Sequence, residues 1–343
     1  MLLILVILGL MCSFLGGVLI MVLMNKGKKT ATTAMGSPPS SPAGTTGTAG
    51  GDGVPAIAGK FPARVFSPYW DTSDESVKWQ SCPSKFITLA FVLGDSSGTP
   101  KWNGEQPLSS KVSLAKKIRA AGKDFIISFG GQAGTELGQA ITDVTKLANA
   151  YKSVVDMYQA KWVDFDIEGS STGDVPAVTR RHKAIAKLQK AKPDLIVSFT
   201  LPVMPSGLPS NEVNFLKIAK EQGVRVDVVN IMTMDYGPSF SGDMGAYATE
   251  AARNTYNQVQ GVGLKSAKIG ICPMIGVNDV QSEVFTVANA RSVRDWARKT
   301  PWVRWLAFWS IGRDNSRANP NQLNQSSGIK QRDWEFSQEF AKF

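Results

Sequence analysis

The stretch from Val163 to Gly169 reads VDFDIEG and carries carboxylates at alternate positions, as Asp164, Asp166 and Glu168. Alternate side chains of a β-strand lie on the same face, so this pattern predicts a strand with one acidic and one apolar face. Carboxylates crowded on a buried strand raise one another's pKa, and a carboxyl group that stays protonated near neutral pH can act as a general acid. The alternative is an exposed edge strand whose acidic face is solvated.

The composition is that of a globular protein with a basic surface. The chain has 343 residues, of which 43% are hydrophobic, and a net charge of +10. A positive charge of this size can indicate nucleic-acid binding, but no nucleic-acid motif accompanies it. The densest basic run, Arg180 to Lys192, has apolar residues at helical spacing and is typical of a solvated helix face. We therefore expect no nucleic-acid partner.

Cysteine and histidine are too scarce to support most metal or nucleophile chemistry. The cysteines are Cys12, Cys82 and Cys272, and His182 is the single histidine. At most one disulfide, between Cys82 and Cys272, is compatible with the position of Cys12 in the apolar N-terminus. We expect no His-based triad, no metal site and no cofactor.

The N-terminus predicts a membrane anchor over residues 1–25. Leu2 to Met24 contains no charged residue and would span about 34 Å as a helix, enough for a bilayer. A cleaved signal peptide is the rival interpretation, but a basic region before the apolar run and a cleavage site after it are both absent. Lys26, Lys28 and Lys29 follow the span and would place the rest of the chain in the cytoplasm. The function inferred below favours an extracytoplasmic domain, and the two indications conflict.

Residues 26–60 are rich in Pro, Gly, Ser, Thr and Ala, and they predict a flexible linker without a core of its own. Residues 61–343 then form the predicted folded domain. The part from Thr30 to about Lys60, a flexible coil of about 31 residues, has an r.m.s. span of roughly 30 Å and would tether this domain near the membrane.

Apolar runs alternate with helical patterns throughout residues 61–343. The predicted strands are Ala63–Ser67, Phe86–Leu93, Asp124–Phe129, Trp162–Glu168, Ile196–Leu201, Val226–Met232, Lys268–Cys272 and Val303–Ser310. The clearest predicted helices are Lys111–Ala121, Asp143–Gln159, Val175–Lys190, Asn211–Gln222, Ala246–Val259 and Ser282–Arg298. Eight strands alternating with helices predict an α/β fold of the (β/α)8 TIM-barrel type. A doubly wound open sheet is the alternative, but its glycine-rich loop is missing after the first strand.

In a (β/α)8 barrel the active site lies at the carboxyl ends of the strands. In this chain those ends carry aromatic residues, carboxylates and glycines, which suit a sugar ring and its glycosidic bond. We expect Tyr69 and Trp309 in the site, and Phe91 and Phe308 in the barrel core.

Three of these segments together resemble the family-18 glycoside hydrolases, the chitinase family, and in particular its bacterial-type branch. They are SFGG at Ser128–Gly131, DFDIE at Asp164–Glu168, and the late-barrel Trp309. The resemblance extends over about residues 61–343. It implies no cofactor and no metal, and a chitin or other N-acetylglucosamine-containing oligosaccharide as the partner.

The resemblance also implies roles for individual residues. Glu168 would be the general acid and base, and Asp166 would orient the substrate's acetamide, which itself acts as the nucleophile. Asp164 would tune Asp166 through shared charge. Asp235 would contact the substrate in the same subsite, and Trp309 would form its floor.

The chain departs from the family pattern at two places. Lys161 and Trp162 stand where Asp and Gly often open the acidic motif. Met234 stands where a tyrosine often holds the acetamide oxygen, and Tyr236, two residues on, is the candidate to replace it. We further expect a non-proline cis peptide between Trp309 and Ser310, and mostly one helix between Cys272 and Val303.

The leading hypothesis is a membrane-anchored chitinase-like hydrolase that cleaves β-1,4-N-acetylglucosamine linkages with retention of anomeric configuration. One alternative is a glycan-binding protein that has weak or no activity. Another is an endo-N-acetylglucosaminidase that acts on N-glycans or peptidoglycan. A structural membrane protein with a barrel domain is the remaining one.

Overall fold

The computed structural model describes residues 53–56 and 59–343. The predicted anchor, residues 1–25, and most of the predicted linker lie outside the described residues. Among the residues that are described, no helix is both long and apolar enough to cross a membrane.

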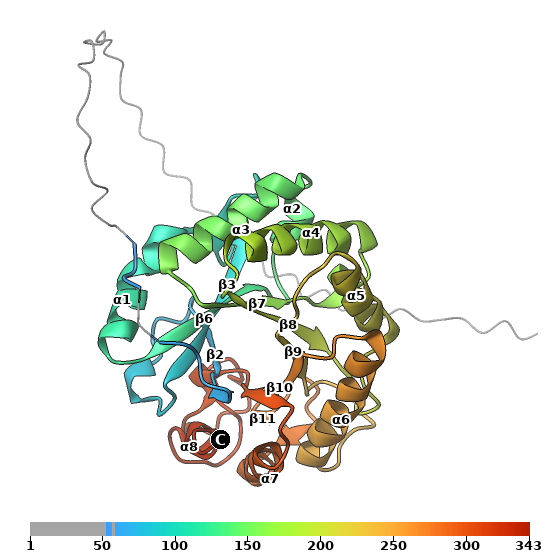
Figure 1. The fold of residues 1–343 in the computed structure, drawn as a ribbon. Coiled ribbons are helices and arrows are strands. Elements are labelled where there is room, and N and C mark those ends of the chain that lie inside the picture. The colour runs from blue at the N-terminus through green and yellow to red at the C-terminus, as the bar shows by residue number, and fades with distance from the viewer. Residues whose placement is uncertain (1–52, 57–58) are drawn as a thin grey trace, which may run out of the picture. The chain divides into compact units, whose positions relative to one another are not determined.

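A parallel sheet closes into a barrel at the centre of the molecule, with helices around it (Figure 1). The first strand position is shared by two short segments, β1 and β2. β1 pairs with the last strand, β13, and β2 pairs with β3, and these two pairings close the sheet. The strands of the barrel are β1 (Val65–Phe66), β2 (Tyr69–Asp71), β3 (Phe86–Gly94), β6 (Asp124–Gly130), β7 (Trp162–Asp166), β8 (Ile196–Pro202), β9 (Val228–Met232), β10 (Lys268–Cys272) and β13 (Val303–Leu306). The predicted α/β fold is confirmed.

The helices that cover the barrel begin where the sequence offers a cap. The side chains of Asp143, Asp174 and Asp243 accept backbone N–H groups at the starts of α3, α4 and α6, which satisfies donors that have no partner within the helix. The helices are α1 (Val112–Ala120), α2 (Leu137–Ala140), α3 (Val144–Tyr158), α4 (Val175–Ala191), α5 (Ser210–Glu221), α6 (Met244–Val262), α7 (Val287–Arg298) and α8 (Glu335–Phe340).

Several connections differ from the expected alternation. The one from β3 to α1 holds two short antiparallel strands, β4 (Pro100–Trp102), which pairs with β3, and β5 (Gln106–Pro107), which pairs with β4. The crossover from β2 to β3 holds a short 3-10 turn (Trp79–Ser81) where a barrel helix would lie. The connection after β10 contains an antiparallel pair, β11 (Gly276–Val277) and β12 (Val284–Phe285), so the prediction of mostly one helix is wrong. α7 begins at Val287 rather than at Ser282, because Thr286 and Asn289 form a capping box there.

Large aromatic side chains fill the interior of the barrel. Trp162 and Trp305 are fully buried and meet edge to face with ring centroids 5.4 Å apart. Tyr69 stacks on Trp305 at 5.9 Å. The interior is therefore packed, as in other barrels of this size. Trp162 thus has a structural place in the barrel where the family pattern often has glycine.

Residues before the predicted domain boundary already contact the barrel. Val54 is 2% exposed, and its N–H donates to the carbonyl of Met157 over 2.9 Å. Arg119 donates from Nη1 to the carbonyl of Pro55 over 2.6 Å. The described part of the predicted linker therefore packs against the folded domain.

Candidate active site

β7 places its carboxylates inside the barrel because it is a central strand. It pairs with β6 on one side and β8 on the other, and every residue from Trp162 to Asp166 is buried. Val163 and Phe165 belong to the core between sheet and helices. Asp164 and Asp166 alternate with them and take the opposite face. The alternative of an exposed edge strand is wrong.

Asp164 is held by four hydroxyl groups from three other strands. Its Oδ2 accepts from Tyr69 Oη and from Ser128 Oγ, each at 2.8 Å, and its Oδ1 accepts from Ser198 Oγ at 2.6 Å and from Thr200 Oγ1 at 2.9 Å. Burial raises the pKa of Asp164, and these hydrogen bonds act against the increase. Asp164 is therefore fixed in position beneath the pocket and has no route to a substrate.

Asp166 lies one layer above, at the pocket. It is 5% exposed, and its Oδ1 has no hydrogen-bond partner among the described residues. Burial raises the pKa of Asp166 well above its usual value, and the negative charges of Glu168 and Asp164 add to the effect. A buried carboxyl oxygen without a partner at the pocket is available to a ligand.

Glu168 follows the end of β7 and is half-buried at the same pocket. Burial, and then the charge of Asp235, raise the pKa of Glu168 to about 7. A carboxyl group with this pKa is protonated in a large fraction of molecules at neutral pH, which a general acid requires.

Two glycines at the end of β6 let the backbone of β7 come close. Gly130 has φ +97°, and a Cβ there would lie 2.0 Å from the carbonyl oxygen of Asp166. Gly131 has φ +91° and donates its N–H to the same oxygen over 2.9 Å. The SFGG segment thus has two roles. Its serine, Ser128, donates a hydrogen bond to Asp164, and its glycines let the backbone approach and bond to the carbonyl of Asp166. Only glycine fits at Gly130 and Gly131.

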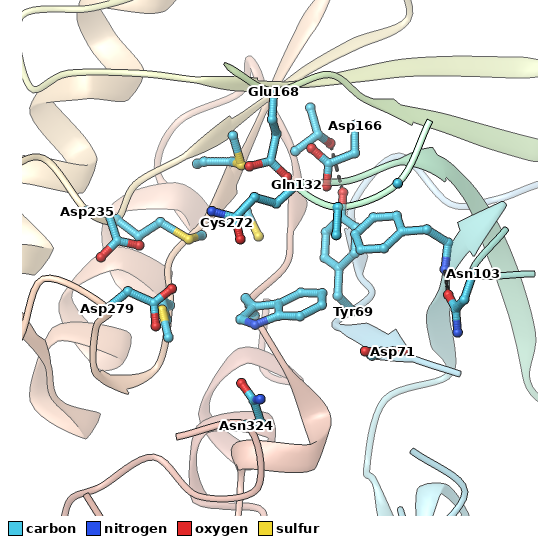
Figure 2. Close-up of a pocket in the computed structure, with 18 of the residues that line it drawn as sticks. Tyr69, Asp71, Asn103, Gln132, Asp166, Glu168, Asp235, Cys272, Asp279 and Asn324 are labelled. Atoms are coloured by element: carbon cyan, nitrogen blue, oxygen red, sulfur yellow. Dashed lines mark hydrogen bonds between the residues drawn. The ribbon is translucent and has the colours of Figure 1, made fainter. Parts of the chain in front are cut away.

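The pocket is a cavity of about 420 Å³ at the carboxyl ends of the strands. Figure 2 shows Glu168 and Asp166 above it, with Asp235 and Asp279 at one end and Asp71 at the other. Its walls combine aromatic, sulfur-containing and polar side chains. They include Tyr69, Phe91, Trp309, Met232, Met234, Cys272, Asn103, Gln132, Thr200 and Asn324.

The aromatic residues at the pocket agree with the expectation only in part. Trp309 lines the pocket as expected, and the predicted cis peptide between Trp309 and Ser310 is present. Phe91 also lines the pocket and stacks on Trp309 at 5.8 Å, so the prediction that Phe91 is core is wrong, whereas Phe308 is fully buried as expected. Tyr69 lines the pocket but is 1% exposed, with its hydroxyl bound to Asp164. Tyr69 therefore supports the acidic residues more than it contacts a ligand.

The loop after β9 brings Asp235 to the pocket and turns Tyr236 away. Asp235 has φ +53° and accepts at Oδ1 from the N–H of Val280 over 2.8 Å. Glu283, which precedes β12, accepts from the N–H of Gly237 over 2.8 Å. Tyr236 is buried against Phe240 and does not line the pocket, so the structure does not bring it to the site as the sequence predicts. Neighbouring residues of this left-handed turn point in different directions.

Several pocket residues were not anticipated from the sequence. Asp71 ends β2, and Asn103, Asp279 and Asn324 come from three separate loops. No local pattern marks these residues, because only the folded backbone brings them to one pocket. Phe91 could have been found, since it lies near the carboxyl end of a predicted strand.

No metal site is built from the described residues, where no group of three or more His, Cys, Asp or Glu side chains could hold an ion. Cys82 and Cys272 are both buried and free, so the disulfide that the sequence left open is not formed. Cys272 instead lines the pocket beside the acidic residues.

Comparison with known proteins finds one family and relatives whose names agree with it. Residues 65–300 match the sequence profile of the family described as "Glycosyl hydrolases family 18". The "Probable bifunctional chitinase/lysozyme" of Escherichia coli (strain K12) is 33% identical over 281 residues, which cover 74% of this chain and 31% of that protein. "Endochitinase 11" of Metarhizium anisopliae is 33% identical over 279 residues, which cover 74% of this chain and 53% of that protein. The chain thus spans about a third and about half of the length of these two relatives.

A solved structure is similar to this chain in both fold and sequence. Active domain 2 of the thermostable chitinase from Pyrococcus furiosus, in catalytic-site mutants complexed with chito-oligosaccharides, is 33% identical with a TM-score of 0.75. The match covers 85% of this chain and 97% of that one.

Proposed function

This chain belongs to glycosyl hydrolase family 18, and we propose that it is a chitinase-like hydrolase of β-1,4-linked N-acetylglucosamine polymers. The observation that carries the proposal is the arrangement at the end of β7. Asp166 and Glu168 reach one pocket from the same strand end, and burial raises the pKa of both. The relatives named chitinases support this substrate class.

In the proposed reaction, Glu168 gives its proton to the oxygen of the leaving sugar. The acetamide of the preceding sugar attacks its own anomeric carbon, and Asp166, with its unpartnered Oδ1, holds the acetamide N–H and stabilises the cyclised form. Glu168 then removes a proton from the water that opens this intermediate, so the anomeric configuration is retained. Asp164 tunes Asp166, because, beyond the effect of burial, its negative charge raises the pKa of Asp166. Trp309 forms the floor under the sugar ring.

Glu168→Gln tests this mechanism, because the amide keeps the size of the side chain and cannot donate the proton. We expect turnover of N-acetylglucosamine oligosaccharides to fall roughly 10²- to 10⁴-fold. NMR of the wild-type products should show the retained anomer first. Unchanged turnover in the variant, or an inverted first product, would rule the mechanism out.

The same assay separates hydrolysis from glycan binding without catalysis. A wild-type chain that is retained on chitin beads but releases no oligosaccharide would be a binding protein. The raised pKa of Glu168 favours hydrolysis, because a binding site has no need for a carboxyl that is poised to donate a proton.

We also propose that residues 2–24 anchor the protein in a membrane and hold the hydrolase on the extracytoplasmic side. The support is the uncharged length of this segment and the polymeric substrate of the proposed reaction. The full chain should stay in the membrane pellet after alkaline carbonate washing and should be digested by protease added to intact cells. Release by carbonate would contradict the anchor, and protection from protease would contradict the orientation.

A further inference from the structure

The pocket is acidic on a protein that is basic as a whole. Five carboxyl side chains line it, those of Asp71, Asp166, Glu168, Asp235 and Asp279, and within the described chain no Lys, Arg or His side chain joins them in its wall. The net charge of the chain is +10. The pocket is therefore negatively charged, whereas the chain as a whole is positively charged.

These five carboxyl groups have no ionic partner among the described residues. None of the salt bridges of the barrel includes them. The charge of Arg313 acts on Asp235 and Asp279 from behind the wall. Arg313 is fully buried, however, and donates to the carbonyls of Ile275, Val277 and Leu323 over 2.5–2.8 Å. The guanidinium group of Arg313 thus hydrogen-bonds to backbone carbonyls, and Arg313 does not line the cavity.

The carboxylates that face water lie at the two ends of the pocket, as Figure 2 shows, with Asp71 at one end and Asp235 and Asp279 at the other. Asp166 adds a buried oxygen without a partner between them. A glycan chain that crosses the pocket therefore passes Glu168 and Asp166 in the middle and meets negative charge at both ends.

We propose that this pocket selects its glycan by charge. This inference rests on the proposed function and concerns the same site. Amino-sugar polymers with some free amines, that is partly N-deacetylated chitin, bind better than fully acetylated chitin, because their ammonium groups lie beside Asp71 and Asp279. Glycans that carry carboxylates, such as the N-acetylmuramic acid strands of peptidoglycan, bind worse. The sugar before the scissile bond still needs its acetamide, which is the nucleophile.

Affinity measured without turnover tests this selection by itself. Calorimetry on the full chain with Glu168→Gln would compare three hexasaccharides. The first is fully acetylated, the second has free amines on its two terminal sugars, and the third alternates N-acetylglucosamine with N-acetylmuramic acid. The same titrations in Asp71→Asn, in Asp279→Asn and in the double variant Asp71→Asn/Asp279→Asn identify the groups responsible. Asp194→Asn is the control, and it matches each single variant in charge. Asp194 is exposed and precedes β8, at the opposite end of the barrel strands.

At low salt the amine-bearing hexasaccharide should bind about 3- to 10-fold more tightly than the acetylated one, and the muramyl hexasaccharide about 3-fold or more weakly. Salt at about 0.5 M, and the double variant, should bring the three dissociation constants within about two-fold of one another, because screening or neutralisation removes the field. Asp194→Asn should keep the differences. Equal affinities at low salt, or differences that survive in the double variant, would overturn the proposal.

A separate measurement distinguishes failure of this inference from failure of the proposed function. Cleavage of the fully acetylated hexasaccharide by the wild-type chain tests the proposed function and does not depend on charge selection. If the wild type cleaves this substrate but the three affinities are equal, only the charge selection is wrong. If it fails to cleave while the affinities differ as expected, only the hydrolase proposal is wrong.

Discussion

Three carboxyl groups on one strand have three different environments, and the environment decides what each can do. Asp164 accepts hydrogen bonds from four hydroxyl groups, two at each carboxylate oxygen. Asp166 keeps an unpartnered oxygen at the pocket, and Glu168 has a pKa of about 7. The same side-chain chemistry thus gives a fixed support, a group open to a ligand and a proton donor, according to burial and hydrogen bonding.

Asp235→Asn should move the alkaline limb of the kcat/KM profile to lower pH. The charge of Asp235 raises the pKa of Glu168, so its removal lowers that pKa, and Glu168 loses its proton at a lower pH. We expect a displacement of about half a pH unit or more. Asparagine can still accept the N–H of Val280 and tolerates the left-handed backbone of this residue.

Asp279→Asn is the matched control for that profile. Asp279 is an exposed carboxylate of the same pocket, but it is not among the groups that raise the pKa of Glu168. A limb that stays in place in Asp235→Asn, or that moves equally in Asp279→Asn, would contradict the assignment.

At the scale of elements, the site depends on how closely β6 approaches β7. The end of β6 has two glycines in the left-handed region, and the carbonyl of Asp166 occupies the space that a side chain at Gly130 would need. The hairpin β11–β12 fixes the loop after β9 through two hydrogen bonds from its connecting residues. Val280 donates its N–H to Asp235, and Glu283 accepts the N–H of Gly237. Strand ends and loops therefore position the acidic groups together.

Gly130→Ala should lower both stability and activity. Its Cβ would lie 2.0 Å from a backbone oxygen that cannot rotate away, so β7 must shift. We expect the free energy of unfolding to fall by about 3 kcal/mol and turnover to fall with the displacement of Asp166. Urea titration and oligosaccharide assays measure the two effects.

Gly122→Ala separates the collision from the backbone conformation. Gly122 has φ +73°, and no atom lies within 4 Å of the position that an alanine methyl group would take. This variant should therefore cost only about 1 kcal/mol of the free energy of unfolding. Equal losses of stability in the two variants would show that the approach of Asp166 has no part in the effect.

At the scale of the whole molecule, the folded unit includes residues that the sequence assigns to a linker. Val54 is buried and bonded to Met157, and Pro55 accepts from Arg119. These contacts join a segment without a hydrophobic pattern of its own to α1 and α3.

A chain that starts at residue 61 should be less stable than one that starts at residue 53. Loss of the buried Val54 side chain and of its hydrogen bond should lower the free energy of unfolding by about 2 kcal/mol, or the melting temperature by about 4 °C. Calorimetry of the two chains measures the difference, and Val54→Ala in the longer chain should fall between them. Identical melting temperatures would show that these contacts contribute nothing.

Much of this fold could be predicted from the sequence because its signals are local. The alternation in VDFDIEG, the helix starts at Asp143 and Asp174, and the succession of strands and helices depend on neighbouring residues only. The acidic groups at the end of β7 and Trp309 follow from the same patterns. The start of α7 differs from the prediction because the pairing of β12 with β11 overrides the helical pattern of its residues.

The composition of the pocket was decided by the tertiary structure. Asp71, Asn103, Asp279 and Asn324 are far apart in the chain and meet only when the barrel closes. Tyr236 does not line the pocket, because the backbone turn at Asp235 directs it elsewhere, and no periodicity encodes that turn. The sequence determined which residues could do the chemistry, because residue type and spacing are local properties. The structure determined their pKa values and partners, because burial and proximity depend on the whole chain.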